Sequence, residues 1–233
     1  MKILADFIAN NFASVDAEKA CALFEKYYDI LTEWNGRFNL TAITEKPDVE
    51  IKHFVDSAIG GRFIHAGQAV CDIGCGAGFP SIPLAILMPD THFCLVDSLD
   101  KRIKFIDAVV EELQLTNCEF LHSRAEDFAV ANRDTFDVCV ARAVAPMPTL
   151  LEYTIPLLKV GGKLVAYKGA NAGEELNQCD FAFKELGCAI DEIWNTRLPN
   201  NDERALCVIK KTRKTNEKYP RGQNKARLAP LTK

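Results

Sequence analysis

The sequence lacks several features that mark membrane, secreted and metal-binding proteins. It contains no run of 18 apolar residues, so we expect no helical membrane span. Its first ten residues, with Lys2 and an early Asp6, lack the charged-then-apolar layout of a secretion signal. None of its nine cysteines form a C-x-x-C pair, and no histidine pair near them has zinc-ligand spacing. We therefore expect neither a membrane nor a metal among its partners.

The number of cysteines is odd, which argues against a complete disulfide framework. Cys71, Cys94, Cys139 and Cys207 all lie in apolar runs that are typical of strands. A cysteine buries readily as a small hydrophobic side chain. We therefore predict buried free thiols, the state expected in a reducing cytoplasm.

Charge of both signs is plentiful, but it is unevenly distributed. The chain has 233 residues and a net charge of −4, yet residues 210–233 hold nine of the 28 basic residues and one of the 32 acids. A basic segment on an acidic body predicts a local contact with a polyanion. The alternative is that this segment is a solvated, frayed end.

Apolar patterning predicts one large α/β domain with a helical appendage. In the first 66 residues, Asp16 caps a helix that we expect to end at Gly36, and Pro47 begins another that ends before Gly60. From residue 67, strand-like and helix-like segments alternate, which predicts a parallel sheet with helices on both faces. The strand-like runs are 69–73, 92–97, 118–122, 136–141, 162–168, 189–198 and 204–210, and the helix-like segments are 79–88, 99–114, 125–130, 147–159 and 172–186.

The most informative segment is 69–80, an apolar run that carries Asp72 and then breaks into Gly74-x-Gly76-x-Gly78. A buried strand that runs into a glycine-rich turn and a helix is how an α/β sheet receives a nucleotide-like ligand. Dinucleotide sites use G-x-G-x-x-G, so the third glycine comes one residue early here. A carboxylate before the first glycine would repel a pyrophosphate and attract a cation. The segment resembles the first motif of class I methyltransferases, whose donor, S-adenosylmethionine, is cationic.

The order of the segments fits the same fold class. Five parallel strands, followed by a hairpin across residues 199–202, predict a Rossmann-like, mostly parallel seven-stranded sheet with a C-terminal antiparallel hairpin. We expect three parts: a helical N-terminal extension (1–66), an S-adenosylmethionine-binding methyltransferase domain (67–211) and a basic C-terminal tail (212–233).

Ligands of open α/β sheets lie beyond the carboxyl ends of the strands. The second strand ends at Asp97, whose carboxylate can accept both ribose hydroxyls. The third leads to Ala125 and Glu126, which can flank and bond an adenine, and the fourth leads to Arg142. Structural alternatives exist for each: Asp72 or Asp97 caps the next turn or helix, Glu126 is a solvated helix-start acid, and Arg142 pairs with one of those aspartates.

Short motifs spread over nearly the whole chain make the resemblance specific. They are residues 39–43, 53–57, 72–85, 96–102, 124–126, 142–145, 168–169 and 219–221, and the Phe79-Pro80-x-Ile82-Pro83 stretch is unusual among methyltransferases. This set resembles the glucose-inhibited division protein B family. The resemblance implies methylation of guanine N7 in the decoding-region loop of 16S rRNA in the bacterial small subunit. It also implies that S-adenosylmethionine is contacted by Gly74, Phe79, Ala125, Glu126 and Arg142.

Guanine N7 has a free lone pair and no proton to lose, so its methylation needs no general base. Proximity and alignment supply most of the acceleration. We therefore expect Arg142 to position the cofactor or the guanine O6. His53 and Asp56 lie three residues apart on one helix, and either stabilise that helix or pack on the core. The candidate RNA contacts are Arg37, Lys168, Arg197, Arg204, Arg213, Lys218 and Arg221.

Three other functions are open at this point. The same fold could methylate a small molecule or a protein, which the basic tail disfavours. An NAD-dependent dehydrogenase is disfavoured by the glycine spacing and by the terminal hairpin. A non-enzymatic RNA-binding or assembly factor is disfavoured by the intact glycine loop and by Asp97. The sequence does not say whether naked rRNA, an assembly intermediate or the complete small subunit is the substrate.

Overall fold

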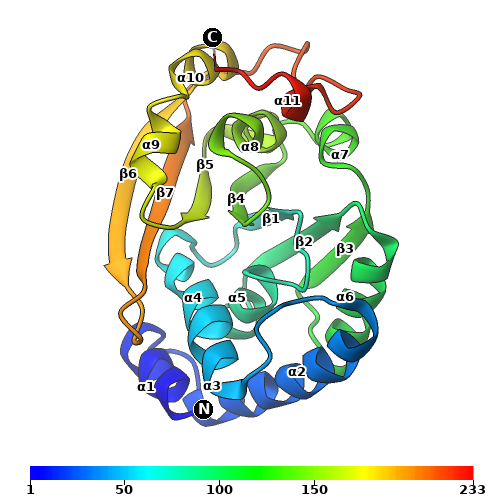
Figure 1. Cartoon of the computed structure of the whole chain (residues 1–233), viewed down its shortest axis with the longest axis vertical. Coiled ribbons are helices and arrows are strands. Elements are labelled where there is room, and N and C mark those ends of the chain that lie inside the picture. The colour runs from blue at the N-terminus through cyan, green and yellow to red at the C-terminus, as the bar shows by residue number, and fades with distance from the viewer. Residues whose placement is uncertain (233) are drawn as a thin grey trace.

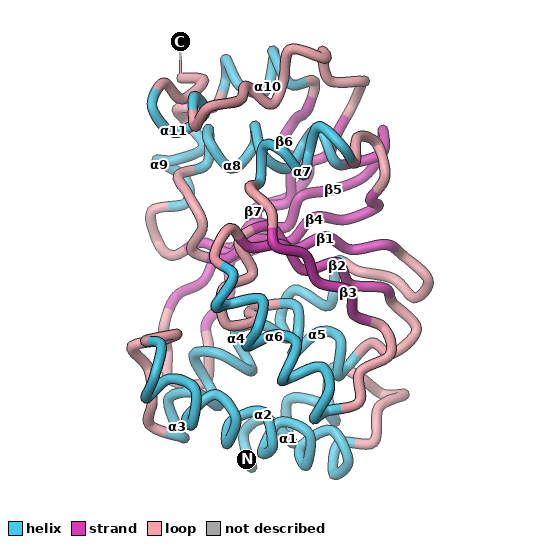
Figure 2. Tube along the Cα trace, turned by 90° about the vertical axis from the view of Figure 1, so that its right-hand side faces the viewer, coloured by secondary structure: helices cyan, strands magenta, loops and turns pink. Residues whose placement is uncertain are grey.

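The fold is built on one seven-stranded sheet (Figures 1 and 2). The strands of the computed structural model, which describes residues 1–232, are β1 (Ala69–Ile73), β2 (His92–Asp97), β3 (Cys118–His122), β4 (Phe136–Arg142), β5 (Leu158–Lys168), β6 (Cys188–Arg197) and β7 (Glu203–Lys211). Their order in the sheet is β3-β2-β1-β4-β5-β7-β6. The first five pair in parallel, whereas β7 runs antiparallel between β5 and β6. This confirms the predicted mostly parallel sheet with a C-terminal antiparallel hairpin.

Helices cover both faces of the sheet, and each face has its own hydrophobic core. One layer holds α1 (Lys2–Asn11), α2 (Ala17–Phe38), α3 (Lys46–Val49), α4 (Asp56–Ala58), α5 (Ser81–Leu87) and α6 (Asp100–Leu113). The other holds α7 (Ala125–Ala131), α8 (Met147–Thr154), α9 (Ala172–Leu176), α10 (Asp180–Leu186) and α11 (Lys225–Leu228). Figure 2 shows the sheet edge-on between these two layers. The N-terminal helices thus extend the α5–α6 layer.

The long helix α2 begins where the sequence predicts and ends later. The Asp16 carboxylate accepts hydrogen bonds from the backbone N–H groups of Glu18 and Lys19, as expected of an N-cap. The predicted end at Gly36 is wrong, because the helix continues to Phe38 and is closed by Asn39 at φ 49°. An exposed glycine inside a helix destabilises it by only about 1 kcal/mol. The aromatic contact between Trp34 and Phe38 spans the position of Gly36.

The second predicted helix also runs further than expected. Helix α3 continues through a π-helical turn (Glu50–Val55) into α4 and a 3-10 turn (Ile59–Phe63), so Gly60 does not end it. The glycine is needed for a close approach, since a Cβ on Gly60 would lie 1.9 Å from the hydroxyl oxygen of Tyr167 on β5. That hydroxyl donates to the carbonyl oxygen of Ser57 at 2.7 Å. This contact fixes the helical segment 46–63 against the carboxyl end of β5.

Two helices predicted on the opposite face are shorter than expected. The segment 147–159 leaves the α-helical path after Thr154, because Pro156 lacks an N–H, and β5 already begins at Leu158. The segment 172–186 is divided into α9 and α10. In one continuous helix Ala182 would be turned about 80° from Ala172, whereas the break allows both to be buried.

The C-terminal residues pack on the domain, as Figure 1 shows beside α8. Tyr219, Ala226 and Leu231 are buried in the core of the α7–α11 layer. Arg221 forms an ion pair of 2.7 Å with Glu152 on α8, which has no exposed side-chain surface. The alternative of a frayed, solvated end is therefore wrong for this part of the chain.

Cysteine placement agrees with the sequence analysis. Cys71, Cys94, Cys139 and Cys207 are buried, and all nine cysteines are free thiols. Among residues 1–232, no helix combines the length and apolar character needed to cross a membrane. The same residues contain no cluster of three or more His, Cys, Asp or Glu side chains arranged to hold a metal ion.

Candidate cofactor cleft and active site

The glycine-rich turn lies between β1 and α5, and its three glycines differ in what surrounds them. Gly74, Gly76 and Gly78 have φ values of 74°, 59° and 86°, which side chains disfavour. A Cβ on Gly78 would lie 2.6 Å from Ile82 and 2.8 Å from the Tyr27 hydroxyl oxygen, so this glycine is required by protein packing. A Cβ on Gly76 would meet nothing closer than a backbone oxygen at 3.9 Å. Only Gly76 therefore leaves room for a ligand above the turn.

Asp97 connects the glycine turn to the next helix. Its carboxylate accepts hydrogen bonds of 3.0 Å from the backbone N–H groups of Gly76 and Leu99, and another of 3.0 Å from Arg102. The helix-capping alternative is thus part of its role. A carboxylate offers about four acceptor positions, so one remains for a ribose hydroxyl.

A polar cleft of about 490 Å³ opens beside this turn, at the carboxyl ends of β1, β2, β3 and β4. Four of the predicted cofactor residues line it, namely Gly74, Asp97, Ala125 and Glu126. Its remaining walls come from Ile73, Val96, Ser98, Leu99, Arg102, Ser123, Arg124, Ala143, Val144, Tyr153, Asn224 and Arg227. The cleft thus lies at the ends of four strands, where an α/β sheet binds nucleotide-like ligands.

Asp72 lies deeper, on β1 below the glycine turn. The Ser81 hydroxyl donates to its Oδ2 at 2.7 Å, whereas Oδ1 is buried without a hydrogen-bond partner among the described residues. Burial raises the pKa of Asp72 to about 7, although the Ser81 hydrogen bonds and the charge of Arg142 oppose the shift. An unpaired buried acceptor of this kind fits a cationic group.

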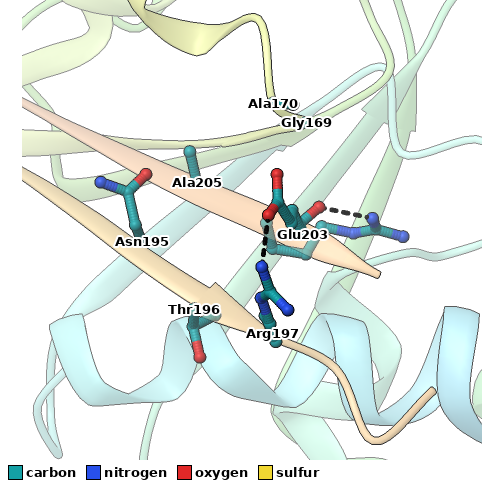
Figure 3. A pocket seen from close by; sticks show the side chains of 8 residues that line it. Gly169, Ala170, Asn195, Thr196, Arg197, Glu203 and Ala205 are labelled. Atoms are coloured by element: carbon teal, nitrogen blue, oxygen red, sulfur yellow. Dashed lines mark hydrogen bonds and ion pairs between the residues drawn. The ribbon is translucent and has the colours of Figure 1, made fainter. Parts of the chain in front are cut away.

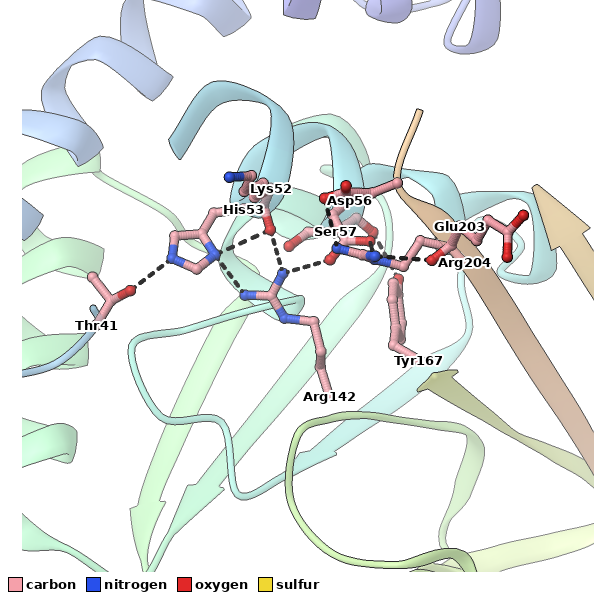
Figure 4. A network of polar contacts seen from close by, with 10 residues as sticks. Thr41, Lys52, His53, Asp56, Ser57, Arg142, Tyr167, Glu203 and Arg204 are labelled. Atoms are coloured by element: carbon pink, nitrogen blue, oxygen red, sulfur yellow. Dashed lines mark hydrogen bonds and ion pairs between the residues drawn. The ribbon is translucent and has the colours of Figure 1, made fainter. Parts of the chain in front are cut away.

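Arg142, at the end of β4, is held by the helical segment 46–63 (Figure 4). Its Nη1 donates to the Lys52 carbonyl oxygen and to Asp56 Oδ2, and its Nη2 donates to His53 Nδ1, each at 3.0 Å. The guanidinium group lies 5.0 Å from the centre of the Phe79 ring. The ionic partner of Arg142 is therefore Asp56, and neither Asp72 nor Asp97 as the structural alternative supposed.

His53 is the neutral member of this network. Burial and then the positive charge of Arg142 lower the pKa of His53 to about 3. Nδ1 also lies 3.2 Å from the Lys52 carbonyl oxygen, but that oxygen already accepts from Arg142 Nη1. Because a guanidinium group only donates, we assign Nδ1 as the acceptor, which leaves the proton on Nε2 to be donated to the Thr41 hydroxyl at 2.8 Å. The ring also stacks on Phe79, with centroids 4.3 Å apart. His53 and Asp56 thus hold Arg142, which neither alternative from the sequence included.

Comparison with known proteins now assigns the chain to a family. A family model described as rRNA small subunit methyltransferase G (GidB) matches residues 20–199. The chain belongs to this family. It is 46% identical over 213 residues to the ribosomal RNA small subunit methyltransferase G of Streptococcus gordonii, covering 89% of this chain and 90% of that protein. It is 43% identical over 232 residues to the protein of the same name from Bacillus subtilis, covering 94% and 97%. The resemblance seen in the sequence motifs is confirmed.

Solved structures support the fold assignment for this GidB-family chain. It is similar to TYW2 from P. horikoshii in complex with MeSAdo, with a TM-score of 0.56, 12% identity and coverage of 68% of this chain and 62% of that one. It is also similar to a SAM dependent methyltransferase from Aquifex aeolicus, with a TM-score of 0.55, 16% identity and coverage of 71% and 93%. At these identities the likeness shows the fold.

The seven predicted RNA contacts of the GidB-family chain all have protein partners, and burial divides them. Arg37, Arg197 and Lys218 are exposed and pair with Glu33, Glu203 and Glu185. Lys168 and Arg204 are largely buried and pair with Glu175 and Asp56, Arg221 pairs with Glu152, and Arg213 donates to the Lys184 carbonyl oxygen. Exposed ion pairs are worth at most about 1 kcal/mol, so the first three can exchange a carboxylate for a phosphate.

A second hollow of about 360 Å³ lies beyond the end of β5 (Figure 3). Gly169 and Ala170 border it on one side, and Asn195, Arg197 and Glu203 of the β6–β7 hairpin border it on the other. Arg204 also lines this hollow and donates to Asp56 Oδ1 at 2.8 Å. Asp56 therefore lies between Arg142 and the lining of this hollow.

Sequence reasoning missed two groups of residues in this family member. Asp56 and His53 were noticed but given no role, although their i, i+3 spacing places them on one helix face. Asn224 and Arg227 were counted only as part of a basic tail, yet both line the cleft. Phe79 and Gly78, by contrast, are packed in the core beneath the turn and do not line the cleft.

Proposed function

We propose that this protein transfers a methyl group from S-adenosylmethionine to N7 of a guanine in 16S rRNA of the small ribosomal subunit, in the decoding-region loop. The observation that carries the proposal is the cleft lined by Gly74, Asp97 and Glu126 in a chain of the rRNA small subunit methyltransferase G family. We place the enzyme in the cytoplasm, where the small subunit is assembled.

The residues present fit S-adenosylmethionine on observations independent of the family. Gly76 leaves room above the turn, Asp97 has an acceptor position left for a ribose hydroxyl, and the unpaired Oδ1 of Asp72 suits a cationic amino group. Glu126, which also lines the cleft, suits the exocyclic amine of an adenine. When bound, S-adenosylmethionine supplies an electrophilic methyl group on a sulfonium ion.

The residues around Arg142 are suited to positioning rather than to proton transfer. His53 is neutral and its two ring nitrogens are engaged, so it is not available as a general base, and methylation of N7 requires none. Both terminal nitrogens of Arg142 are bound by the segment 46–63. Among the described residues, its Nε–H and the second N–H of Nη2 have no acceptor. We propose that one of these N–H groups orients the guanine O6 or the cofactor.

We propose that the rRNA approaches along the side of the molecule that carries Arg197 and the second hollow. The exposed pair of Arg197 with Glu203, both of which line this hollow, supports this because breaking it costs little. The buried pairs of Lys168 and Arg204 favour a structural role for those two residues, with Lys168 donating to the Ala145 carbonyl oxygen at 3.1 Å. Salt should weaken rRNA binding in proportion to the phosphates contacted.

The test is methylation of small subunits and of naked 16S rRNA from cells that lack the protein. Purified protein and labelled S-adenosylmethionine are added, and mass mapping locates the modified nucleotide. We expect one N7-methylguanine in the decoding-region loop, and the comparison of the two substrates shows which one is used. Methylation of a different base, or transfer only to a protein or a small molecule, would contradict the proposal.

A further inference from the structure

The C-terminal segment 219–229 reaches the cofactor cleft, a position that neither its composition nor its sequence motifs predict. We propose that this segment is a wall of the S-adenosylmethionine site, with Arg227 as a cofactor-binding residue and the Asn224 backbone N–H as a positioning group for Glu126. The inference rests on the proposed function, because it takes the cleft to be the cofactor site. It differs from the sequence-based expectation that the basic tail contacts a polyanion.

The start of the segment is tethered to the domain by buried contacts. The Arg221 side chain donates to both oxygens of Glu152, from Nε at 2.8 Å and from Nη2 at 2.7 Å, and its backbone N–H donates to Oε1 at 2.8 Å. The Tyr219 hydroxyl donates to Glu185 at 2.8 Å. Because Glu152 is fully buried, loss of Arg221 would leave an uncompensated charge. The segment is thus held in one place on α8.

From this tether the chain runs to the rim of the cleft. The Thr149 hydroxyl donates to the Ala226 carbonyl oxygen at 2.9 Å, which fixes the short helix α11 over α8. The Asn224 N–H donates to Glu126 Oε1 at 3.2 Å, and Arg227 Nη2 donates to the Val144 carbonyl oxygen at 3.3 Å. Asn224 and Arg227 both line the cleft. The segment therefore bridges the adenine wall at Glu126 and the loop after β4.

These contacts couple the segment to the ligand through Glu126. One carboxylate oxygen is occupied by the tail N–H, and Oε2 has no hydrogen bond within residues 1–232, so it is left for the adenine. The tail N–H thus fixes the carboxylate in the orientation that the adenine requires. Binding linkage is reciprocal, so a ligand that needs this orientation must also hold the segment in place.

Arg227 acts through its hydrogen bond and its stem rather than through its charge, since S-adenosylmethionine is itself cationic. The guanidinium group bonds a neutral carbonyl oxygen, and the aliphatic stem can cover apolar surface. A glutamine at this position would keep a donor without the charge. The Arg227→Gln variant should therefore retain more affinity than Arg227→Ala.

The experiment measures S-adenosylhomocysteine binding to the full chain by calorimetry, and hydrogen exchange of residues 219–229 with and without that ligand. Arg227→Ala should weaken binding about tenfold, the scale of one lost hydrogen-bonding wall residue, and Arg227→Gln should weaken it less. Lys225→Ala is the matched control, because it removes the same charge from the same short helix and does not line the cleft. In the wild type, the ligand should slow exchange of the Asn224 amide.

Unchanged affinity in Arg227→Ala together with unchanged exchange at Asn224 would overturn the inference and leave the proposed function standing. Arg227 and Lys225 are both exposed, so their variants should melt near the wild-type temperature. An unchanged melting temperature shows that a loss of affinity does not come from unfolding. If the wild type binds S-adenosylhomocysteine with these effects but methylates no rRNA, the proposed function fails and the inference holds. A wild type that does not bind S-adenosylhomocysteine overturns both.

Discussion

Asp56 and Arg142 lie 86 positions apart in the chain, yet they form an ion pair of 3.0 Å with 5% and 14% of their side-chain surfaces exposed. The other oxygen of the same carboxylate accepts from Arg204 at 2.8 Å. One aspartate on the N-terminal helical segment therefore holds two arginines, from β4 and β7. The appendage and the methyltransferase domain share a charged joint at the candidate active site.

The first prediction concerns this joint. Asp56→Asn leaves Arg142 without its counter-charge and removes the nearer of the two acidic partners of Arg204. The free energy of unfolding should therefore fall by about 3 kcal/mol, as for other broken buried pairs. Urea unfolding measures the change. Glu33→Gln, which breaks the exposed pair with Arg37, is the control and should cost at most about 0.5 kcal/mol. Equal losses in the two variants would show that burial does not strengthen the Asp56 pair.

The second prediction is a pH dependence that arises from His53. The pKa of His53 is about 3 in the folded protein and 6.5 in the unfolded chain. Above pH 6.5 the histidine is neutral in both states, so it does not lower the free energy of unfolding there. As the pH falls below 6.5, the unfolded chain binds a proton at His53 and the folded protein does not. By pH 5 this difference should lower the free energy of unfolding by about 2 kcal/mol. Because Asp72 titrates in the opposite sense over this range, the His53 contribution is the difference between the pH effects on the wild type and on His53→Gln, each measured by urea unfolding at pH 7.5 and pH 5.

Replacement of the ring tests that assignment. His53→Gln should lose this part of the pH dependence, whereas His65→Gln, at an exposed histidine, should keep it. A wild-type slope that persists in His53→Gln would assign the titration to another group.

Asp72 should behave in the opposite sense. The pKa of Asp72 is about 7 in the folded protein and exceeds the ordinary 3.8, so the free energy of unfolding falls as the pH rises from 3.8 to 7. Asp72→Asn should therefore stabilise the ligand-free protein at pH 8 by several kcal/mol and have little effect near pH 4. Thermal unfolding across this pH range is the measurement.

The same group predicts a pH dependence of ligand binding. A cationic amino group next to Oδ1 favours the ionised carboxylate, so affinity for S-adenosylhomocysteine should rise through pH 7 in the wild type. In Asp72→Asn the affinity should be weaker and nearly independent of pH. An Asn variant that binds as tightly as the wild type at pH 8 would show that the amino group lies elsewhere.

The fourth prediction uses the difference between two glycines with positive φ. Gly76→Val and Gly67→Val both force a side chain into the left-handed region, at a cost of about 1–2 kcal/mol, and a Cβ on either would have no protein atom closer than 3.9 Å. Gly76 lies in the glycine turn and donates to Asp97, which lines the cleft, so Gly76→Val should abolish S-adenosylhomocysteine binding. Gly67→Val should leave it unchanged, and calorimetry distinguishes the two.

The parts of the fold that the sequence predicted depend on local patterns. The strands around Asp72 and Asp97 are short apolar runs, and the cap at Asp16 needs only the backbone N–H groups of Glu18 and Lys19. Gly60 was misread because a glycine after a helical pattern usually ends the helix, whereas here it accommodates Tyr167 from a distant strand. No local pattern records such a contact.

The partner of Arg142 was missed for a similar reason. Asp72 and Asp97 end neighbouring strands, so topology alone brings them near Arg142. Asp56 is on a segment whose position against the sheet depends on packing, which includes the hydroxyl of Tyr167 on Ser57. The tail was misplaced because Tyr219, Ala226 and Leu231 have no regular spacing that would reveal a buried face.

The position of β7 has a consequence for synthesis of the chain. The strand that is translated last lies inside the sheet, between β5 and β6, so until it emerges β5 has an unpaired backbone edge. Unpaired edges of long apolar strands favour intermolecular association. A chain interrupted before residue 203 therefore ends as an aggregation-prone fragment, although it already contains the glycine turn and every strand up to β6.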